Sequence, residues 1–275
     1  MNSSKFFVPE QAPPEDQIIC SLINQGLRPR HLLKAAITFY QLELSEKVRA
    51  QSSIPILSGL FKGMLANTTT LSSVLLPKYL GTYELELQKV LVKYASNVNG
   101  FVDIGCAEGY YVNGIAYWLK IPSIGVDINP VSESLVLQTA VNNNLHLWVK
   151  FRPLISEALA LVSDKILILV DVDGSEIDVL KDTFNYLSDQ ASLLKSIRNV
   201  LFIIETDYNK DGMDNTENIL ELLSINRCKV LTVASQNPLL RFSSHTSHLS
   251  FLDQCVCGLE GRAASQKWII ASWIT

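Results

Sequence analysis

The sequence predicts a doubly wound α/β domain that follows an N-terminal helical cap. From residue 100 onward, short runs of Ile, Leu and Val alternate with amphipathic segments of helical length. This alternation is typical of parallel βαβ units, and continuously apolar strands indicate a sheet covered on both faces. Before residue 95, apolar residues recur at spacings of three and four, which favours helices. We therefore divide the chain into a cap and substrate lid, residues 1–95, and an α/β domain, residues 96–275.

Each element is expected from its own pattern. In the cap, helical periodicity covers residues 15–50 with a break at Arg28-Pro29-Arg30, and it returns over residues 83–94. The expected strands are 100–105, 123–128, 147–151, 166–172, 200–206, 229–234 and a closing strand over 267–274. The expected helices between them are 110–120, 131–142, 155–162, 177–187 and 216–225.

Composition excludes several classes of protein. With 48% hydrophobic and 18% charged residues, the chain is not intrinsically disordered. A net charge of −4 argues against a dedicated nucleic-acid binder, which needs a surplus of Lys and Arg. No apolar run approaches the roughly 20 residues of a membrane helix. The apolar run near the N-terminus is too short for the core of a signal peptide. The five scattered cysteines favour reduced thiols, so we expect a soluble cytoplasmic protein.

Carboxylates and glycines gather where the first two strands of the α/β domain end, and ligands of open α/β sheets bind at such ends. Asp103 lies at the end of the first strand, and Gly105 and Gly109 flank a tight turn into a helix. Asp127 ends the second strand about 20 residues further on, where a carboxylate can accept both hydroxyls of a ribose. This pattern predicts a nucleotide-like ligand.

The glycine turn is not a dinucleotide fingerprint. Ala107 stands where the second glycine of G-x-G-x-x-G would admit a pyrophosphate, and Glu108 adds a carboxylate. An acidic turn suits a ligand with a cationic amino acid end better than it suits a diphosphate. The turn therefore indicates S-adenosylmethionine, whose ammonium and sulfonium groups are positive.

These motifs carry a resemblance to a known family. Asp103-x-Gly105-x-x-x-Gly109, followed by Gly125-Val126-Asp127, resembles the first two motifs of class I S-adenosylmethionine-dependent methyltransferases. The segment 171–176, Asp-Val-Asp-Gly-Ser-Glu, is similar to the Asp-x-Glu-Gly-x-Glu segment of the FkbM type, with Asp in place of the usual Glu. Segment 81–87, Glu260-Gly261-Arg262 and Trp268 also match that type, so the resemblance spans roughly residues 80–275.

The resemblance implies a Rossmann-like sheet of seven strands, the last antiparallel and placed between the fifth and sixth. It implies cofactor contacts that we assign to Tyr83, Asp103, Gly105, Cys106, Ala107, Gly109, Tyr110, Asp127, Ile128 and Asp171. The sequence departs from the family in two places. Residues 153–161 lack the acidic residue that often meets the adenine amine, unless Glu157 serves, and residues 204–207, Ile-Glu-Thr-Asp, lack the histidine that relatives often carry.

The carboxylates after the fourth and fifth strands have several possible roles. Asp171, Asp173 and Glu176 could hold Mg²⁺, could include a general base, or could shape the turn and cap the next helix. We rank the structural role first for Glu176 and a cofactor or substrate contact first for Asp171. Glu205 and Asp207 are candidate substrate contacts at the next strand end. We take Asp171, Asp173 and Glu205 as the catalytic candidates and assign no metal ligand.

Two pairs near the C-terminus have weaker claims. We expect His245 and His248 to lie in a polar loop and not at a metal site. The insertion that contains them, residues 236–266, is a candidate lid. Cys255 and Cys257 lack the second cysteine pair that a tetrahedral zinc site would need.

The resemblance implies a methyltransferase, with S-adenosylmethionine as cofactor and a sugar or small-molecule hydroxyl as acceptor. N- or C-methylation, a NAD-dependent oxidoreductase and a non-catalytic interaction module that uses the cap as a partner surface stay open as alternatives. A nucleic-acid methyltransferase is disfavoured because no basic stripe with aromatic residues occurs. We therefore expect a small-molecule hydroxyl acceptor as partner, no nucleic acid and no membrane.

Overall fold

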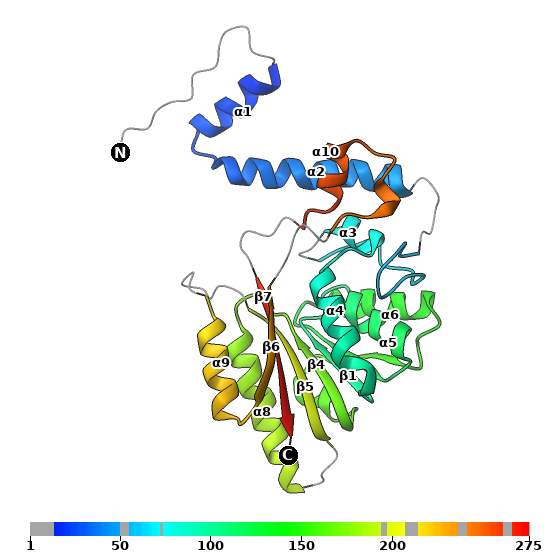
Figure 1. Ribbon diagram of the computed structural model, residues 1–275, viewed down its shortest axis with the longest axis vertical. Coiled ribbons are helices and arrows are strands. Elements are labelled where there is room, and N and C mark those ends of the chain that lie inside the picture. The colour runs from blue at the N-terminus through cyan, green and yellow to red at the C-terminus, as the bar shows by residue number, and fades with distance from the viewer. Residues whose placement is uncertain are drawn as a thin grey trace.

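A seven-stranded sheet lies at the centre of the computed structural model, which describes residues 14–49, 55–71, 74–193, 197–206, 214–235, 241–260 and 266–274 (Figure 1). The strands are β1 (Gly100–Ile104), β2 (Ser123–Val126), β3 (Val149–Phe151), β4 (Asp164–Val170), β5 (Ile197–Thr206), β6 (Lys229–Ser235) and β7 (Lys267–Ile274). Their order is β3-β2-β1-β4-β5-β7-β6. Strand β7 runs antiparallel to both β5 and β6. The predicted fold class, with the last strand antiparallel between the fifth and sixth, is confirmed.

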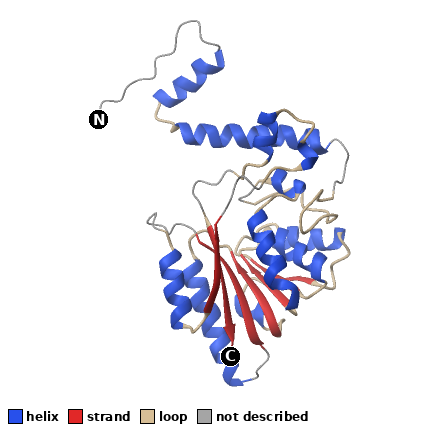
Figure 2. Cartoon of the chain, viewed as in Figure 1, coloured by secondary structure: helices blue, strands red, loops and turns tan. Residues whose placement is uncertain are grey.

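Helices cover both faces of the sheet (Figure 2). Helices α4 (Leu85–Tyr94), α5 (Tyr110–Leu119) and α6 (Ser132–Asn142) share one apolar core with the sheet. Helices α7 (Ile155–Leu159), α8 (Glu176–Leu193) and α9 (Thr216–Ile225) share the other. Phe101 belongs to the first core and Val102 to the second, because neighbouring strand residues point to opposite faces. Two-sided burial explains the continuously apolar strands.

The expected element boundaries differ from the observed ones mainly at surface ends. Helix α7 ends at Leu159, earlier than expected, and β3 begins at Val149. Leu147 and Trp148 precede β3 and are exposed, so these two apolar residues are not part of the strand that was expected over 147–151. No helix in the described ranges is both long and apolar enough to cross a bilayer.

Three helices precede the sheet on its upper side: α1 (Pro14–Asn24), α2 (Pro29–Arg49) and α3 (Leu75–Leu80). Figure 1 shows α2 passing above the sheet edge, beside α10 (Phe251–Cys257), while α1 projects away from the domain. The Gln41 side chain donates hydrogen bonds to the carbonyls of Val256 at 2.8 Å and Leu259 at 2.5 Å. Helix α2 is thereby tied to the segment before β7. The boundary at residue 95 stays a prediction.

Candidate functional site

A cavity of about 1480 Å³ lies where the carboxyl ends of the parallel strands meet. Helix α2 contributes Ile37, Thr38 and Gln41 to its wall, so the cap lies directly over the strand ends. The predicted site residues that line it are Tyr83, Asp103, Gly105, Cys106, Ala107, Tyr110, Asp127, Ile128, Asp171, Asp173 and Glu205. Gly109 does not line the cavity. The structure thus gathers nearly the whole predicted set around one space.

The turn between β1 and α5 is shaped by backbone geometry. Gly105 has φ of 87°, and a Cβ placed there would lie 1.7 Å from the carbonyl oxygen of Asp171. Gly109 has φ of 86° at the helix start, and a Cβ there would lie 2.8 Å from Val136. Ala107 also has a positive φ, 47°, which a side chain rarely adopts. The two glycines therefore let the turn lie against neighbouring elements, and Gly109 serves the fold.

Asp127 holds this turn in place. One carboxylate oxygen accepts the Ala107 N–H at 2.7 Å, and the other accepts the Asn129 N–H at 2.7 Å. Each carboxylate oxygen can accept a further hydrogen bond, so the group remains able to meet a diol. Ile128, the next residue, is fully exposed although it lines the cavity, and Leu154, which also lines the cavity, is 56% exposed. A carboxylate in a cavity that these aliphatic side chains also line suits a ribose that carries a flat apolar ring.

Three carboxylates meet at the other end of the cavity. Oxygen atoms of Glu84, Asp171 and Glu205 all lie within 4.8 Å of one another, and we call these residues the carboxylate cluster. Glu84 and Glu205 are buried, whereas Asp171 is partly open to the cavity. The Tyr111 hydroxyl donates a hydrogen bond to Glu84. The cluster joins the end of β4, the end of β5 and the turn before α4.

The electrostatics of this end favour protonated carboxyls. Burial raises the pKa of Asp171, the charge of Asp173 raises it further, and a hydrogen bond with Glu205 opposes both. Burial, with the charge of Asp171, raises the pKa of Asp103 well above its usual range. Asp171 therefore takes up a proton at a higher pH than an ordinary carboxyl does, which suits a proton acceptor.

Asp173 and Glu176 have different positions. Asp173 lines the cavity with a positive φ of 47°, immediately before Gly174. Glu176 is fully buried, where it accepts the Gly174 N–H at 2.7 Å and the Asn215 side-chain amide at 2.8 Å. The structural role that we ranked first for Glu176 is confirmed, because both its oxygens fix the turn and the start of α9.

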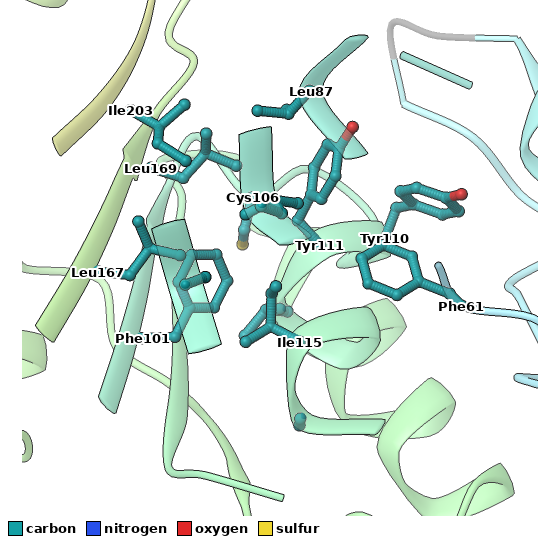
Figure 3. Close-up of a cluster of buried hydrophobic side chains, with 14 of the residues drawn as sticks. Phe61, Leu87, Phe101, Cys106, Tyr110, Tyr111, Ile115, Leu167, Leu169 and Ile203 are labelled. Carbon is teal, nitrogen blue, oxygen red and sulfur yellow. The ribbon is translucent and has the colours of Figure 1, made fainter. Parts of the chain in front are cut away.

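Two aromatic residues follow the glycine turn. Tyr110 and Tyr111 start α5, and Figure 3 shows their rings beside Phe61. The Tyr110 ring centroid lies 5.3 Å from that of Phe61 and 5.5 Å from that of Tyr83. The Tyr110 hydroxyl is buried, and no protein atom among the described residues satisfies it. Cys106, in the same core, is buried, and burial raises its pKa, so it stays a thiol.

Lys78 is a cavity residue that the sequence did not reveal. Its side chain is buried, pairs with Glu108 and lies over the ring of Tyr83, with Nζ 4.7 Å from the centroid. Glu108 also accepts the Leu71 N–H at 3.0 Å. The one available signal was a lysine inside the otherwise apolar segment Leu75–Leu80. Glu108, which we noted as an extra carboxylate, is thus neutralised by a partner 30 residues away.

Glu260 is a further carboxylate at the transfer side of the cavity. It accepts the Glu84 N–H at 2.8 Å and pairs with Arg241, which also contacts Glu86 at 2.9 Å. Burial raises the pKa of Glu260 to about 7, against the opposing charge of Arg241. The expected helix over 83–94 begins only at Leu85, because Glu84 adopts a left-handed φ of 46°. Glu84 therefore turns into the cluster and does not lie on a helix face.

Several other candidates lie away from the cavity. His245 and His248 are exposed, and only a short 3-10 turn, Ser244–Thr246, forms there. Glu157 is exposed and does not line the cavity, whereas Ser156 does. Asp207 and Arg262 lie outside the described residues.

Comparisons with known proteins support the fold alone. No known family model matches the chain. No curated protein matches it either. Among solved structures, the human methyltransferase 10 domain containing protein is 14% identical with a TM-score of 0.46, covering 83% of this chain and 97% of its own. The METTL16 MTase domain is 16% identical with a TM-score of 0.48, covering 83% of this chain and 80% of its own. The structures named as methyltransferases thus share the fold.

One comparison corrects the expected partner. The Bacillus subtilis M1A22 tRNA methyltransferase TrmK is 13% identical with a TM-score of 0.39, covering 66% of this chain and 63% of its own. A structure with this fold therefore acts on tRNA, and the prediction of a small-molecule hydroxyl acceptor with no nucleic acid was wrong. That prediction used the net charge of −4, which averages over the whole chain and does not describe the surface around one cavity.

Proposed function

We propose that this protein is an S-adenosylmethionine-dependent methyltransferase related to the FkbM type. The observation that carries the proposal is the pairing of Asp127 with the fully exposed Ile128 at the rim of a cavity that the glycine turn borders. A ligand that covers this isoleucine gains free energy, since burying such a side chain is worth about 1.5–3 kcal/mol. The carboxylate beside it suits a ribose diol.

The donor set of the cavity fits this cofactor. Seven carboxyl groups line the cavity, and Lys78 is the one cationic side chain among the described residues that do so. S-adenosylmethionine presents a sulfonium, an ammonium and a carboxylate. The cavity offers carboxylates such as Asp103 for the ammonium and Lys78 for the carboxylate. A buried Tyr110 hydroxyl that the described protein atoms leave unsatisfied indicates that a ligand completes the site.

Each end of the cofactor would contact residues that line the cavity or its glycine turn. Asp127 would accept the ribose hydroxyls, and Ile128 and Leu154 would enclose the adenine ring. The amides of Gly105, Cys106 and Gly109 donate to protein carbonyls, and that of Ala107 donates to Asp127. Because these turn amides are engaged, the Lys78 ammonium is the group suited to the methionine carboxylate. An ammonium has three N–H donors, so Lys78 can bind that carboxylate and keep Glu108.

When bound, the cofactor supplies an activated methyl group on a sulfonium. The protein aligns the nucleophile with that methyl and excludes water, which can contribute on the order of 7–11 kcal/mol. Asp171 lines the cavity, is the partly exposed member of the cluster and would accept the proton of the nucleophile. A positioned base adds roughly 10²–10⁴-fold to the rate. Glu205 behind it would share the proton, and Asp173 at the rim would orient the acceptor.

The test is a calorimetric titration of the full chain with S-adenosylmethionine and with S-adenosylhomocysteine. We expect both to bind with micromolar dissociation constants. As a control, Asp178→Ala removes an exposed carboxylate of α8 that does not line the cavity. This variant should bind each ligand as tightly as the wild-type protein does. Failure of both ligands to bind the folded wild-type protein would overturn the proposal.

A further inference from the structure

The layer that contains α4 and α5 exposes charges of one sign. Among residues 55–71 and 74–126, every exposed charged side chain is a lysine, and we call these residues the lysine face: Lys62, Lys89, Lys93 and Lys120. The carboxylates of the same two segments are all buried: Glu84, Glu86, Asp103 and Glu108. The surface of this layer is therefore positive, although the whole chain has a net charge of −4.

The helices on the other face of the sheet expose mainly negative charge. Among the side chains described in α7, α8 and α9, the exposed charged ones are one lysine, Lys181, and six carboxylates: Glu157, Asp178, Asp182, Asp189, Glu217 and Glu221. The net charge of the chain thus averages two layers of opposite sign. Charge that is separated in this way directs a partner of the opposite sign to one face of the molecule.

The loop that carries Lys62 contacts both α4 and α5, which Figure 1 shows on the same side of the sheet. The Leu60 N–H donates a hydrogen bond to the Gln88 side chain of α4 at 2.8 Å. A Cβ placed on Gly63 would lie 2.8 Å from the Tyr117 hydroxyl of α5. Lys62 lies between these two contacts, so its exposed side chain lies where the loop meets both helices.

Each helix adds lysines beside a partly buried aromatic ring. Lys89 and Lys93 lie one turn apart on α4, and the Lys93 Nζ lies 4.8 Å from the ring centroid of Tyr94. Lys120 follows α5, and its Nζ lies 4.7 Å from the ring centroid of Tyr117. No carboxylate among the described residues forms an ion pair with any lysine of the face. The rings therefore orient two ammonium groups without neutralising them.

The lysine face adjoins the cavity. Tyr110, the first residue of α5, lines the cavity, and Lys120 follows the last residue of the same helix. The 10 residues of α5 span about 15 Å, which is the length of about four nucleotides of a stacked strand. A strand that lies on the face can therefore extend to the cavity. No basic stripe occurs along the sequence, because the stripe forms only when the loop, α4 and α5 pack together.

We propose that the lysine face binds the phosphate backbone of a nucleic acid. This interaction goes beyond the proposed function and does not depend on it. A nucleic acid strand carries one negative charge for about every 3.4 Å of its length, so one strand can contact several spaced ammonium groups at once. Lysine ammonium groups are point charges with three donors each, and they bind phosphate oxygens without a fixed geometry.

Two observations favour a nucleic acid over an anionic membrane or an acidic peptide. Val92 is the only large apolar side chain that residues 55–71 and 74–126 expose. A helix that lies on a bilayer inserts a whole apolar face, which this layer does not offer. Tyr94, Tyr117 and Trp118 are partly exposed beside the lysines. Nucleic acid bases stack on such rings, whereas an acidic peptide has no bases.

The test is the salt dependence of binding to an unstructured strand. The full chain is titrated into a fluorescently labelled oligouridylate of about 16 nucleotides, at salt concentrations between about 50 and 200 mM. We expect the affinity to fall about fifty-fold over this range, because four phosphate contacts give a slope of about −3 in log K against log salt. A polyglutamate peptide of the same length should bind at least about tenfold more weakly, since it offers no bases to stack.

Paired variants locate the contact. Lys89→Ala with Lys93→Ala should weaken binding at least about tenfold at about 50 mM salt and reduce the slope to about half. Lys150→Ala with Lys181→Ala is the matched control, because it removes the same charge from the opposite side of the sheet. Lys150 is exposed on β3 between two residues of the core shared with α4 and α5, so it points away from that core. The control should bind the strand as wild type does, and circular dichroism should show both variants folded.

Each outcome supports or overturns the proposal without reference to the cofactor. If the wild-type protein does not bind the oligouridylate at about 50 mM salt, the proposal is overturned. It is also overturned if the two paired variants have the same affinity and slope. Equal or tighter binding of polyglutamate, or of vesicles that contain phosphatidylserine, would assign the face to an acidic protein or to a membrane instead. A protein that binds the strand but not S-adenosylhomocysteine would contradict the proposed function and leave the lysine face as the nucleic-acid site.

Discussion

The two ends of the cavity are built in different ways. At the ribose end, the Ala107 N–H meets Asp127, 20 residues away, across the adjacent parallel strands β1 and β2. At the transfer end, the carboxylate cluster combines β4, β5 and the turn before α4, and Glu260 reaches Glu84 across 176 residues. The first end depends on local turn chemistry and the second on tertiary packing. Substitutions should therefore affect folding, cofactor affinity and pH dependence in separable ways.

The largest effect should come from the point where the two ends touch. Gly105→Ala would place a Cβ 1.7 Å from the Asp171 carbonyl oxygen, at a φ of 87°. Because both atoms belong to backbone-fixed positions, the strand ends must separate. We expect the free energy of unfolding to fall by at least about 3 kcal/mol, as measured by urea unfolding followed by circular dichroism.

Gly26→Ala provides the control for this prediction. Gly26 has a comparable φ of 97° between α1 and α2, but nothing lies within 4 Å of its Cβ position. Only the backbone cost of about 1–2 kcal/mol should appear there. Equal losses for the two variants would mean that the contact between β1 and β4 is not what requires glycine.

Next in size is the loss of the ribose end. Asp127→Ala removes the proposed acceptor of both ribose hydroxyls and leaves the Ala107 and Asn129 amides without their carboxylate. We expect affinity for S-adenosylhomocysteine to fall at least about 100-fold, since hydrogen bonds to charged groups are worth about 1.5–3 kcal/mol each. Calorimetry measures this on a variant shown by circular dichroism to be folded. Retained affinity would remove the ribose assignment.

The same division explains what the sequence could predict. Asp103, Asp127 and Asp171 were found because each lies at the carboxyl end of an apolar strand, and parallel strand ends share one edge. Lys78 and Glu260 were not assigned roles, because their partners lie 30 and 176 residues away and only packing brings them together. Glu84 was expected on a helix, since periodicity does not reveal a left-handed residue before its first turn.

The sequence predicted which residues form helices better than it predicted what those helices pack against. Residues 15–50 were expected to form helices broken near Pro29, and α1 and α2 occur there. Their periodicity did not indicate that Gln41 would tie α2 to α10 and to Leu259 just after it, or that Ile37 and Thr38 would line the cavity. Amphipathic spacing identifies a buried face, but not what that face packs against.

A smaller effect should separate the methionine carboxylate from the rest of the cofactor. Removing Lys78 alone would leave Glu108 buried and unpaired, so the informative variant is Lys78→Met with Glu108→Gln. We expect about tenfold weaker binding of S-adenosylmethionine. Binding of decarboxylated S-adenosylmethionine, which lacks the carboxylate, should be unchanged. Glu108→Gln alone is the matched control and should bind both ligands as wild type does. Equal losses for the two ligands would assign Lys78 to packing.

The smallest effect is a pH dependence of stability that originates at the transfer end. Burial raises the pKa of Glu260 from its ordinary 4.5 to about 7. Between these values the native state holds a proton that the unfolded chain has released. Its contribution to the free energy of unfolding is therefore largest at low pH and is lost as the pH rises through about 7. Glu260→Gln should show a shallower decline than wild type when urea unfolding is measured at pH 5, 6 and 7.

Glu217→Gln, at an exposed carboxylate in the first turn of α9, is the comparison for this slope. It should decline with pH as wild type does, because Asp103 and Asp171, whose pKa values burial also raises, are present in every variant. If Glu260→Gln and wild type gave parallel curves, Arg241 would be holding Glu260 ionised throughout. Glu260 would then contribute nothing to the slope, which would come from other buried groups such as Asp103 and Asp171, whose pKa values burial raises.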